Sequence, residues 1–310
     1  MSFLESSEMR TLLFNRRFMK ILILCSGGDA PGMNRFVYDI YSTFKKDVYF
    51  AYKGFSGLID NQIFPLERVI TKQVKNEAGT IIKSSRCPEF KQKKFFKVAL
   101  ENAKQFDVVI ILGGNGSEKG AKELSENGVN CIFVPATIDN DVEDSNYSIG
   151  FSTAVKECVY AIESSMKSVE SMNTACLFEV MGRENSSIAN LSSKLTNADY
   201  MILEKEDLDF EKMKNIILSK EVKNESAKIV VRENIMPIDE IAKNLNDLIG
   251  FDLVKTHVVG RTQRGGAPTK EELQMADKFA KEVSFCIKKK VFNVRVLANE
   301  KLNIFIDEFV

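Results

Sequence analysis

Short apolar runs, rich in β-branched residues, alternate along this chain with segments of helical periodicity. The predicted strands are residues 21–25, 48–52, 108–112, 131–134, 175–180 and 228–231, and the helical patterns are residues 34–44, 94–104, 119–126 and 154–168. The run at 108–112 is apolar throughout, which is typical of parallel strands covered on both faces. Alternation of this kind predicts a doubly wound α/β protein with mainly parallel sheets.

The last helical segment carries its own start and stop signals. Thr269 and Glu272 form a capping box after Pro268. Apolar residues then recur on one face as far as Ile287, and the pattern ends in three lysines, which suit a helix C-terminus. We predict a helix whose apolar face is buried in the core.

Polar and glycine-rich clusters follow directly after five of the predicted strands. They are residues 27–34, 113–117, 137–141 and 181–183, together with Glu233. Parallel strands present their carboxyl ends at one edge of the sheet, where open α/β folds bind ligands. The sequence therefore predicts a binding site at this edge.

Composition narrows the classes of protein that fit. Lys+Arg 43 balances Asp+Glu 43, so no overall charge attracts nucleic acid or an anionic membrane surface. No apolar run approaches the ~20 residues that a membrane span needs. Six cysteines without CxxC spacing indicate reduced thiols in a cytoplasmic protein, and the single histidine, His257, excludes a multi-histidine metal site. Residues 1–18 are predicted to be an extension outside the fold, and Met19 could be the original start.

The clusters contain the groups that phosphoryl transfer needs. Gly27 and Gly28 lead into a helix, and glycine backbone at a helix N-terminus suits phosphate. Asp139 and Asp141 are two residues apart, so in an extended segment one can act as a base while the other orients a metal ion. Arginines beside glycine or proline, at 86, 183 and 264, are candidate phosphate ligands. Together these groups favour a kinase.

Six motifs in order now suggest a family. They are Gly-Gly-Asp-x-Pro-Gly-x-Asn, Arg-Cys-Pro-Glu-Phe, Gly-Gly-x-Gly-Ser, Thr-Ile-Asp-Asn-Asp, Glu-Val-Met-Gly-Arg and Gln-Arg-Gly-Gly-x-Pro, and they run from residue 27 to residue 268. In the sequence and order of these six motifs, the chain resembles the bacterial-type ATP-dependent 6-phosphofructokinases. The resemblance implies phosphorylation of fructose 6-phosphate by ATP in glycolysis.

The resemblance also implies roles for individual residues. The ATP site would contain Gly28, Phe55, Arg86, Cys87, Gly114, Asn115, Gly116 and Ser117. The sugar phosphate would be held by Thr137, Asp139, Met181, Gly182, Arg183, Glu233, Lys255, Arg261 and Arg264. Asp139 would be the base, assisted by Thr137 and Arg183, and Asn115 and Asp141 would bind Mg²⁺. Gly116 and Ala136 favour ATP over pyrophosphate as the donor.

The resemblance also implies a fold of two Rossmann-like lobes. It further implies that the chain assembles as a homotetramer. Residues 19–150 with 263–310 would form the ATP-binding lobe, and residues 151–262 the sugar-phosphate-binding lobe. The active site would lie between them.

Several positions depart from the family pattern. Asn115 stands in place of a metal-binding aspartate, Thr174 and Lys255 replace two arginines of the sugar-phosphate site, and Arg261 replaces a histidine. Tyr38, Ser42 and Met166 occupy positions where regulated members carry arginines, so we expect weak or absent allosteric regulation. The departures leave two alternatives open: a non-catalytic or weakly active subunit, and a kinase for another sugar phosphate.

Overall fold

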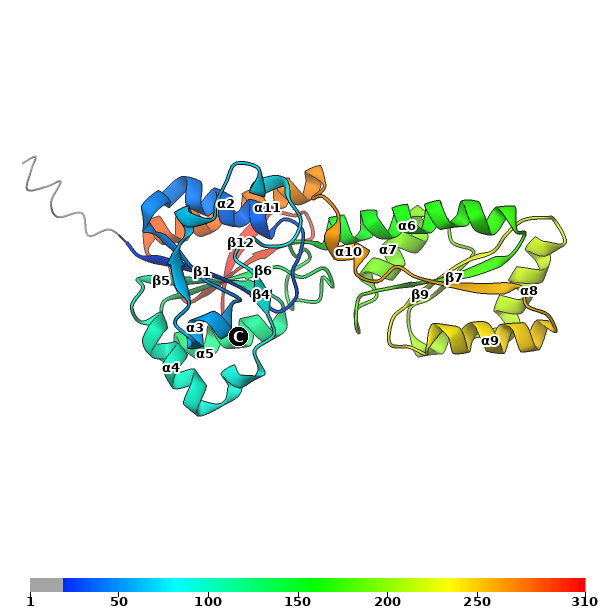
Figure 1. Cartoon of the computed structure of the whole chain (residues 1–310), viewed down its shortest axis with the longest axis horizontal. Helices are drawn as coiled ribbons and strands as arrows, with labels where there is room; N and C mark the ends of the chain where they lie inside the picture. The colour runs from blue at the N-terminus through cyan, green and yellow to red at the C-terminus, as the bar shows by residue number, and fades with distance from the viewer. Residues whose placement is uncertain (1–18, 310) are drawn as a thin grey trace, which may run out of the picture.

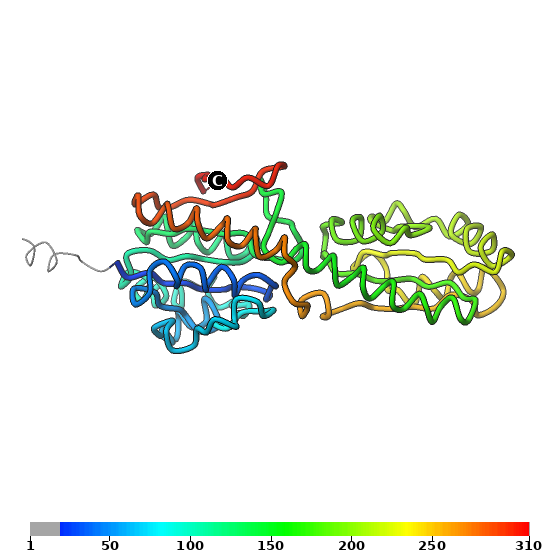
Figure 2. Tube along the Cα trace, turned by 90° about the horizontal axis from the view of Figure 1, so that it is seen from above, coloured from blue at the N-terminus to red at the C-terminus, as the bar shows by residue number. Residues whose placement is uncertain are grey.

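The computed structural model describes residues 19–309, so the predicted extension at residues 1–18 lies outside the described residues. The chain forms two lobes placed side by side in an elongated molecule (Figure 1). Figure 2 shows two crossings between the lobes, one through the start of helix α6 (Phe151–Ser171) and one near the short helix α10 (Thr262–Gly265). We call the lobe that contains the N-terminal strand the first lobe.

The first lobe is built on an eight-stranded sheet. Its strands are β1 (Ile21–Ser26), β2 (Val48–Ala51), β3 (Ile63–Pro65), β4 (Ser84–Ser85), β5 (Val108–Gly113), β6 (Cys131–Pro135), β11 (Val294–Ala298) and β12 (Ile304–Glu308). They are ordered β12-β11-β6-β5-β1-β2-β3, with β4 paired to β1. The pairs β2–β3 and β11–β12 are antiparallel and the other pairs are parallel, so only the two edges reverse direction.

Helices cover both faces of this sheet (Figure 1). On one face lie α2 (Met33–Phe44) and α11 (Lys270–Lys289), and on the other lie α3 (Phe55–Ile59), α4 (Lys93–Ala103) and α5 (Asn115–Glu126). Short 3-10 turns at Lys45–Asp47, Leu66–Arg68, Val74–Asn76 and Pro88–Lys91 join these elements. The central strand β1 is fully buried because both of its faces meet apolar helix surfaces.

The second lobe repeats this plan on a smaller scale. Its strands β7 (Ala175–Val180), β8 (Tyr200–Ile202), β9 (Lys228–Arg232) and β10 (Val254–Val258) are all parallel in the order β10-β7-β9-β8. The helices α6 and α7 (Ser187–Leu195) pack on one face, and α8 (Phe210–Glu221) and α9 (Ile238–Ile249) on the other. A 3-10 turn at Lys205–Asp207 follows β8.

The structure confirms the doubly wound α/β class, and a strand lies at each of the six predicted positions. The bounds of two helices were wrong. Helix α5 begins at Asn115 rather than at 119, because the glycine-rich segment forms its first turn and carries no apolar periodicity. Helix α6 is longer than predicted at both ends.

The capping box at the start of α11 is only half correct. The Thr269 hydroxyl accepts a hydrogen bond from Glu272 N at 3.0 Å, as predicted. The Glu272 carboxylate does not return to the backbone of Thr269, whose N–H donates instead to Thr153 Oγ1 at 3.2 Å. Glu272 points toward α6.

The hairpin β11–β12 was not predicted, and a buried arginine fastens it to the sheet. Arg295 is 1% exposed, and its guanidinium contacts Glu118 Oε1 at 3.1 Å, Asp144 Oδ2 at 3.0 Å and Asp307 Oδ2 at 2.6 Å. These partners come from α5, from the loop after β6 and from β12. A charge that makes several ion pairs can be buried where a lone charge could not.

All six cysteines are free thiols, and Cys87 is the one that is not buried. Among the helices of residues 19–309, none is long and apolar enough to cross a membrane.

Candidate active site

A cavity of about 490 Å³ opens at the carboxyl edge of β1, β5 and β6. All eight residues expected at the ATP site line it: Gly28, Phe55, Arg86, Cys87, Gly114, Asn115, Gly116 and Ser117. They come from separate loops, and the parallel sheet brings these loops to one edge. Thr137, Asp141, Arg183 and Arg264 also line the cavity. It therefore extends from the glycine-rich turns to the segment that follows β6.

Glycines give this cavity its backbone walls. A Cβ atom at Gly28 would lie 2.6 Å from Arg264 Nη1, so a side chain there would displace the arginine. Gly114 is the N-cap of α5, whose free N–H groups and partial positive charge face the cavity. A Cβ atom at Gly116 would have nothing within 4 Å, so open space remains above this residue. This arrangement suits a polyphosphate.

An aromatic pair lines the other end of the cavity. The rings of Phe55 and Phe90 are 4.2 Å apart between centroids, and a Cβ at Gly120 would come within 2.7 Å of Phe55. Lys119 and Glu123, one helical turn apart on α5, stand beside them. Sequence reasoning missed these two residues, although their spacing of four positions on the glycine-rich helix was a usable signal.

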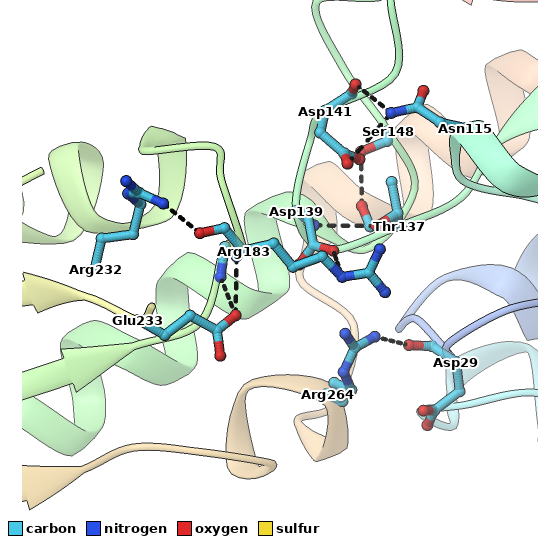
Figure 3. Close-up of polar contacts among 11 residues, drawn as sticks. Asp29, Asn115, Thr137, Asp139, Asp141, Ser148, Arg183, Arg232, Glu233 and Arg264 are labelled. Atoms are coloured by element: carbon cyan, nitrogen blue, oxygen red, sulfur yellow. Dashed lines mark hydrogen bonds and ion pairs between the residues drawn. The ribbon is translucent and has the colours of Figure 1, made fainter. Parts of the chain in front are cut away.

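Asp139 is the buried acid of the site. Its side chain is 1% exposed, and Arg183 Nε lies 3.2 Å from Oδ2 (Figure 3). This contact is an ion pair without hydrogen-bond geometry: neither carboxylate oxygen accepts a hydrogen bond from the described residues. A buried acceptor without a hydrogen bond is rare in native structures, so Asp139 lacks a partner that the described residues do not supply.

The loop around Asp139 is held rigidly. Asp139 N donates to Thr137 Oγ1 at 3.2 Å. Ser148, which is buried, donates from its hydroxyl to Thr137 O at 2.6 Å and from its backbone to Asn140 Oδ1 at 2.8 Å. Asn140 itself has a φ of 51°, a left-handed conformation that asparagine tolerates. The hydrogen bonds fix the direction of the Asp139 side chain.

Burial raises the pKa of Asp139 above its usual value, while the nearby guanidinium groups of Arg183 and Arg264 act in the opposite direction. Asp141 and Glu233 add a smaller upward effect because they are also negative. A carboxylate with a raised pKa is a stronger base than an exposed aspartate, so it is better matched to removing a proton from a hydroxyl.

Comparison with known proteins agrees with this geometry. A sequence model of the family described as Phosphofructokinase matches residues 20–287. The chain belongs to the phosphofructokinase family. The ATP-dependent 6-phosphofructokinase of Vibrio campbellii is 36% identical over 255 residues, which cover 80% of this chain and 79% of the relative. ATP-dependent 6-phosphofructokinase 1 of Clostridium perfringens is 33% identical over 297 residues, or 93% of each chain.

Solved structures of phosphofructokinases have the same fold as this chain. Pichia pastoris phosphofructokinase in the T-state matches with a TM-score of 0.81 and 23% identity, over 94% of this chain and 35% of that chain. The pyrophosphate-dependent phosphofructokinase of Nitrosospira multiformis matches with a TM-score of 0.82 and 16% identity, over 94% and 83%. At these identities the similarity concerns the fold alone.

The second lobe contributes Arg183 to this phosphofructokinase-family site through a constrained loop. Glu233 Oε1 accepts hydrogen bonds from Gly182 N at 3.0 Å and from Arg183 N at 2.9 Å. The carbonyl oxygen of Arg183 accepts a hydrogen bond from Arg232 (Figure 3). One oxygen of Glu233 is therefore engaged in shaping the loop, and the Arg183 side chain is aimed at Asp139.

Gln263 joins this loop to the link between the lobes. It is fully buried, and its Oε1 accepts from Met181 N at 3.1 Å and from Cys158 Sγ at 2.8 Å. The next residue, Arg264, crosses to the first lobe and donates to Asp29 O at 2.8 Å. The sequence indicated a role for Arg264 but none for Gln263, although the two are adjacent in one motif.

Asn115 and Asp141, the two residues predicted to bind Mg²⁺, lie side by side and are joined by hydrogen bonds. Asn115 Nδ2 donates to Asp141 O at 3.0 Å and to Asp141 Oδ2 at 3.4 Å. Among the described residues, no group of three or more His, Cys, Asp or Glu side chains could hold a metal ion. The two residues alone would therefore not form a complete cage.

Lys255 and Arg261 lie outside the cavity. Lys255, on the edge strand β10, forms an ion pair with Asp252 at 2.5 Å. Arg261 is exposed just before α10. Within one chain, neither Lys255 nor Arg261 contacts Asp139 or lines the cavity.

Proposed function

We propose that this protein transfers the γ-phosphoryl group of ATP to the 1-hydroxyl of fructose 6-phosphate, forming fructose 1,6-bisphosphate and ADP. One observation carries the proposal above all others. Asp139 is a buried carboxylate that accepts no hydrogen bond from the described residues and forms an ion pair with Arg183, and Arg183 lines the glycine-walled cavity together with Thr137, Asp141 and Arg264. The relatives' printed name, ATP-dependent 6-phosphofructokinase, supports the same reaction.

In this proposal Asp139 takes the proton of the sugar hydroxyl as the oxygen attacks the γ-phosphorus. The bond from that phosphorus to the β–γ bridging oxygen breaks, and ADP leaves with the bond's electron pair. Arg183 neutralises the negative charge on the phosphoryl oxygens, and Thr137 is positioned to contact the group in transfer. Positioning and charge stabilisation supply most of the rate in such reactions.

ATP would bind with its phosphates on the Gly28 and Gly114–Ser117 turns and its base toward the Phe55–Phe90 pair. The open space above Gly116 supports this placement, since a larger residue there would meet the phosphates. Arg86 and Cys87 line the same cavity and would complete the nucleotide site.

Mg²⁺ fits the donor set of this site when the nucleotide supplies further ligands. Magnesium prefers oxygen donors and is commonly held by one or two carboxylates and substrate phosphates. Asp141 would provide a carboxylate, and Asn115 would provide its amide oxygen after a flip of the amide plane. Bound Mg²⁺ would neutralise charge on the phosphates.

The sugar phosphate would occupy the space between the lobes, beside Met181, Gly182, Arg183, Glu233 and Arg264. Lys255 and Arg261 do not reach this space within one chain. We propose that they serve a site shared with a neighbouring subunit in a homotetramer, and that Arg261 supplies the charge missing at Thr174.

Arg261→Ala tests this role. We expect the KM for fructose 6-phosphate to rise about 10- to 150-fold, because a charge-assisted hydrogen bond contributes roughly 1.5–3 kcal/mol. The kcat should change little. Steady-state kinetics at saturating ATP measure both, and Arg68→Ala, an exposed arginine of the first lobe, is the matched control. An unchanged KM would remove Arg261 from the proposal.

We also propose that allosteric regulation is weak or absent. Tyr38, Ser42 and Met166 have uncharged side chains, and Met166 is buried at 4% exposure, so these three positions offer no cationic group to an anionic effector. A strong shift of the fructose 6-phosphate titration by ADP or phosphoenolpyruvate would contradict this.

A second candidate is a non-catalytic or weakly active subunit, and the amide at Asn115 is the observation that favours it. An assay of ATP-dependent phosphorylation of fructose 6-phosphate with Mg²⁺ separates the two. Activity supports the kinase, and its absence in a folded, ATP-binding sample supports the subunit. Activity on a different sugar phosphate alone would identify a kinase of other specificity.

A further inference from the structure

Glu272 is a fully buried carboxylate that the proposed reaction does not use. It lies in the first turn of α11 and is 0% exposed. Five hydrogen bonds reach its two oxygens, and all come from residues 147–153. The donors are Gly150 N at 2.8 Å, Tyr147 OH at 3.0 Å, Ser152 Oγ at 3.1 Å, Thr153 N at 3.2 Å and Thr153 Oγ1 at 3.1 Å.

Two of these donors are free backbone N–H groups at the N-terminus of α6. That helix of 21 residues begins after Gly150, which has no side chain with which to cap it, and its first turn contains no acidic residue. Glu272 therefore provides, from another helix, the negative group and the hydrogen-bond acceptors that a helix N-terminus requires. Although burial raises the pKa of Glu272, the hydrogen bonds from Gly150, Thr153, Tyr147 and Ser152 favour its ionised form.

The position of α6 matters because this helix carries the second lobe. It leaves the first lobe at Phe151 and runs along the whole second lobe (Figures 1 and 2). It packs against α7 and β7, and the loop that presents Arg183 lies between those two elements. A change in the angle between α6 and α11 would therefore alter the 3.2 Å contact between Arg183 and Asp139.

The same short segment also anchors the loop that carries Asp139. Ser148, between Tyr147 and Gly150, holds Thr137 and Asn140 through its own hydrogen bonds. Glu272 thus holds residues 147–153 in place. This segment positions both Asp139, through Ser148, and Arg183, through α6.

We infer that Glu272 is a positioning residue that sets the orientation of the second lobe by capping α6 from α11. This inference rests on the proposed phosphoryl transfer for its kinetic consequence. Its structural consequence, a fixed angle between the lobes, does not depend on the reaction.

The test replaces Glu272 by glutamine and measures the distance between the lobes. Glu272→Gln keeps the shape of the side chain. It replaces one acceptor oxygen by an NH₂ group, which cannot accept the hydrogen bonds that residues 147–153 donate to that oxygen. Genetically encoded spin-labelled residues at exposed Lys104 and Lys243 report on the two lobes by electron–electron double resonance. Dilution with unlabelled protein keeps one labelled chain in each oligomer.

We expect Glu272→Gln to broaden or shift the distance distribution and to lower kcat about 10- to 100-fold, since a displacement of about 1 Å can have that effect. The Kd for ATP should stay near the wild-type value, because the ATP cavity is built mainly from the first lobe. This division between kcat and Kd distinguishes positioning from general destabilisation. Glu271→Gln, an exposed neighbour in the same turn with the same charge change, should match the wild type in all three measurements.

If Glu272→Gln fails to fold, Thr153→Val removes one of the five hydrogen bonds at nearly constant volume, together with the acceptor of the Thr269 N–H, and should give a smaller change in the same direction. An unchanged distance distribution in the folded variant would overturn the inference. If the wild type transfers no phosphate, the proposed function fails, while the distance measurement still decides the role of Glu272.

Discussion

Asp139→Asn is expected to lower kcat about 100- to 10,000-fold, the range for removing a positioned general base. Asparagine has the same shape but cannot accept the proton of the sugar hydroxyl. Because the side chain is buried and accepts no hydrogen bond from the described residues, its replacement should disturb few contacts. A coupled assay that follows ADP release measures kcat, and calorimetric titration of ATP checks that the nucleotide site remains intact.

The matched control is Asp60→Asn, since Asp60 is exposed at the end of α3 and far along the chain from the cluster. It should retain wild-type activity. If Asp139→Asn kept a kcat within a few-fold of the wild type, another group would have to be the base. Loss of ATP binding in this variant would instead show that Asp139 acts on the nucleotide.

Arg183→Gln is expected to lower kcat about 100- to 1,000-fold, because it removes a preorganised group from the charge that develops during transfer. The uncharged side chain would also leave Asp139 without its ion pair at 3.2 Å. Arg183→Lys keeps the charge but not the planar pair of donors, so it should recover part of the lost rate. Equal loss in both variants would indicate that the guanidinium geometry is required.

The same variant should change the pH dependence of kcat/KM in a defined direction. The base must be ionised, so activity falls as the pH drops through the pKa of Asp139. Arg183 holds that pKa down against the effect of burial. Its removal therefore raises the pKa and moves the acid limb of the profile to higher pH. A limb that stays in place, or moves to lower pH, would mean that another group controls it.

The sequence predicted the residues proposed for ATP better than it predicted those proposed for the sugar phosphate. The half that we propose for the nucleotide follows from local signals, because glycine-rich turns end buried strands and the parallel strands bring these turns to one edge of the sheet. The eight residues expected at the ATP site do line one cavity. The half that we propose for the sugar phosphate depends on how the two lobes meet, and no local pattern indicates that Lys255 and Arg261 lie away from Asp139.

Residues that act across the fold were missed for the same reason. Gln263 and Glu272 belong to recognisable motifs, but their partners are more than 80 residues away in the chain. The capping box at Thr269 even predicted the wrong partner for Glu272, because a helix N-terminus elsewhere in the molecule offered more hydrogen-bond donors than the residue's own turn.

By itself, the sequence determined the doubly wound class, the central strands and the edge of the sheet at which the cavity opens, because these follow from periodicity and from the short range of strand and turn preferences. The tertiary structure alone decided the antiparallel hairpin, which the buried Arg295 fastens to the rest of the first lobe, and the approach of Arg183 to Asp139. The ion pairs of Arg295 join separate segments of the first lobe, and the approach of Arg183 to Asp139 depends on the packing of the second lobe through α6.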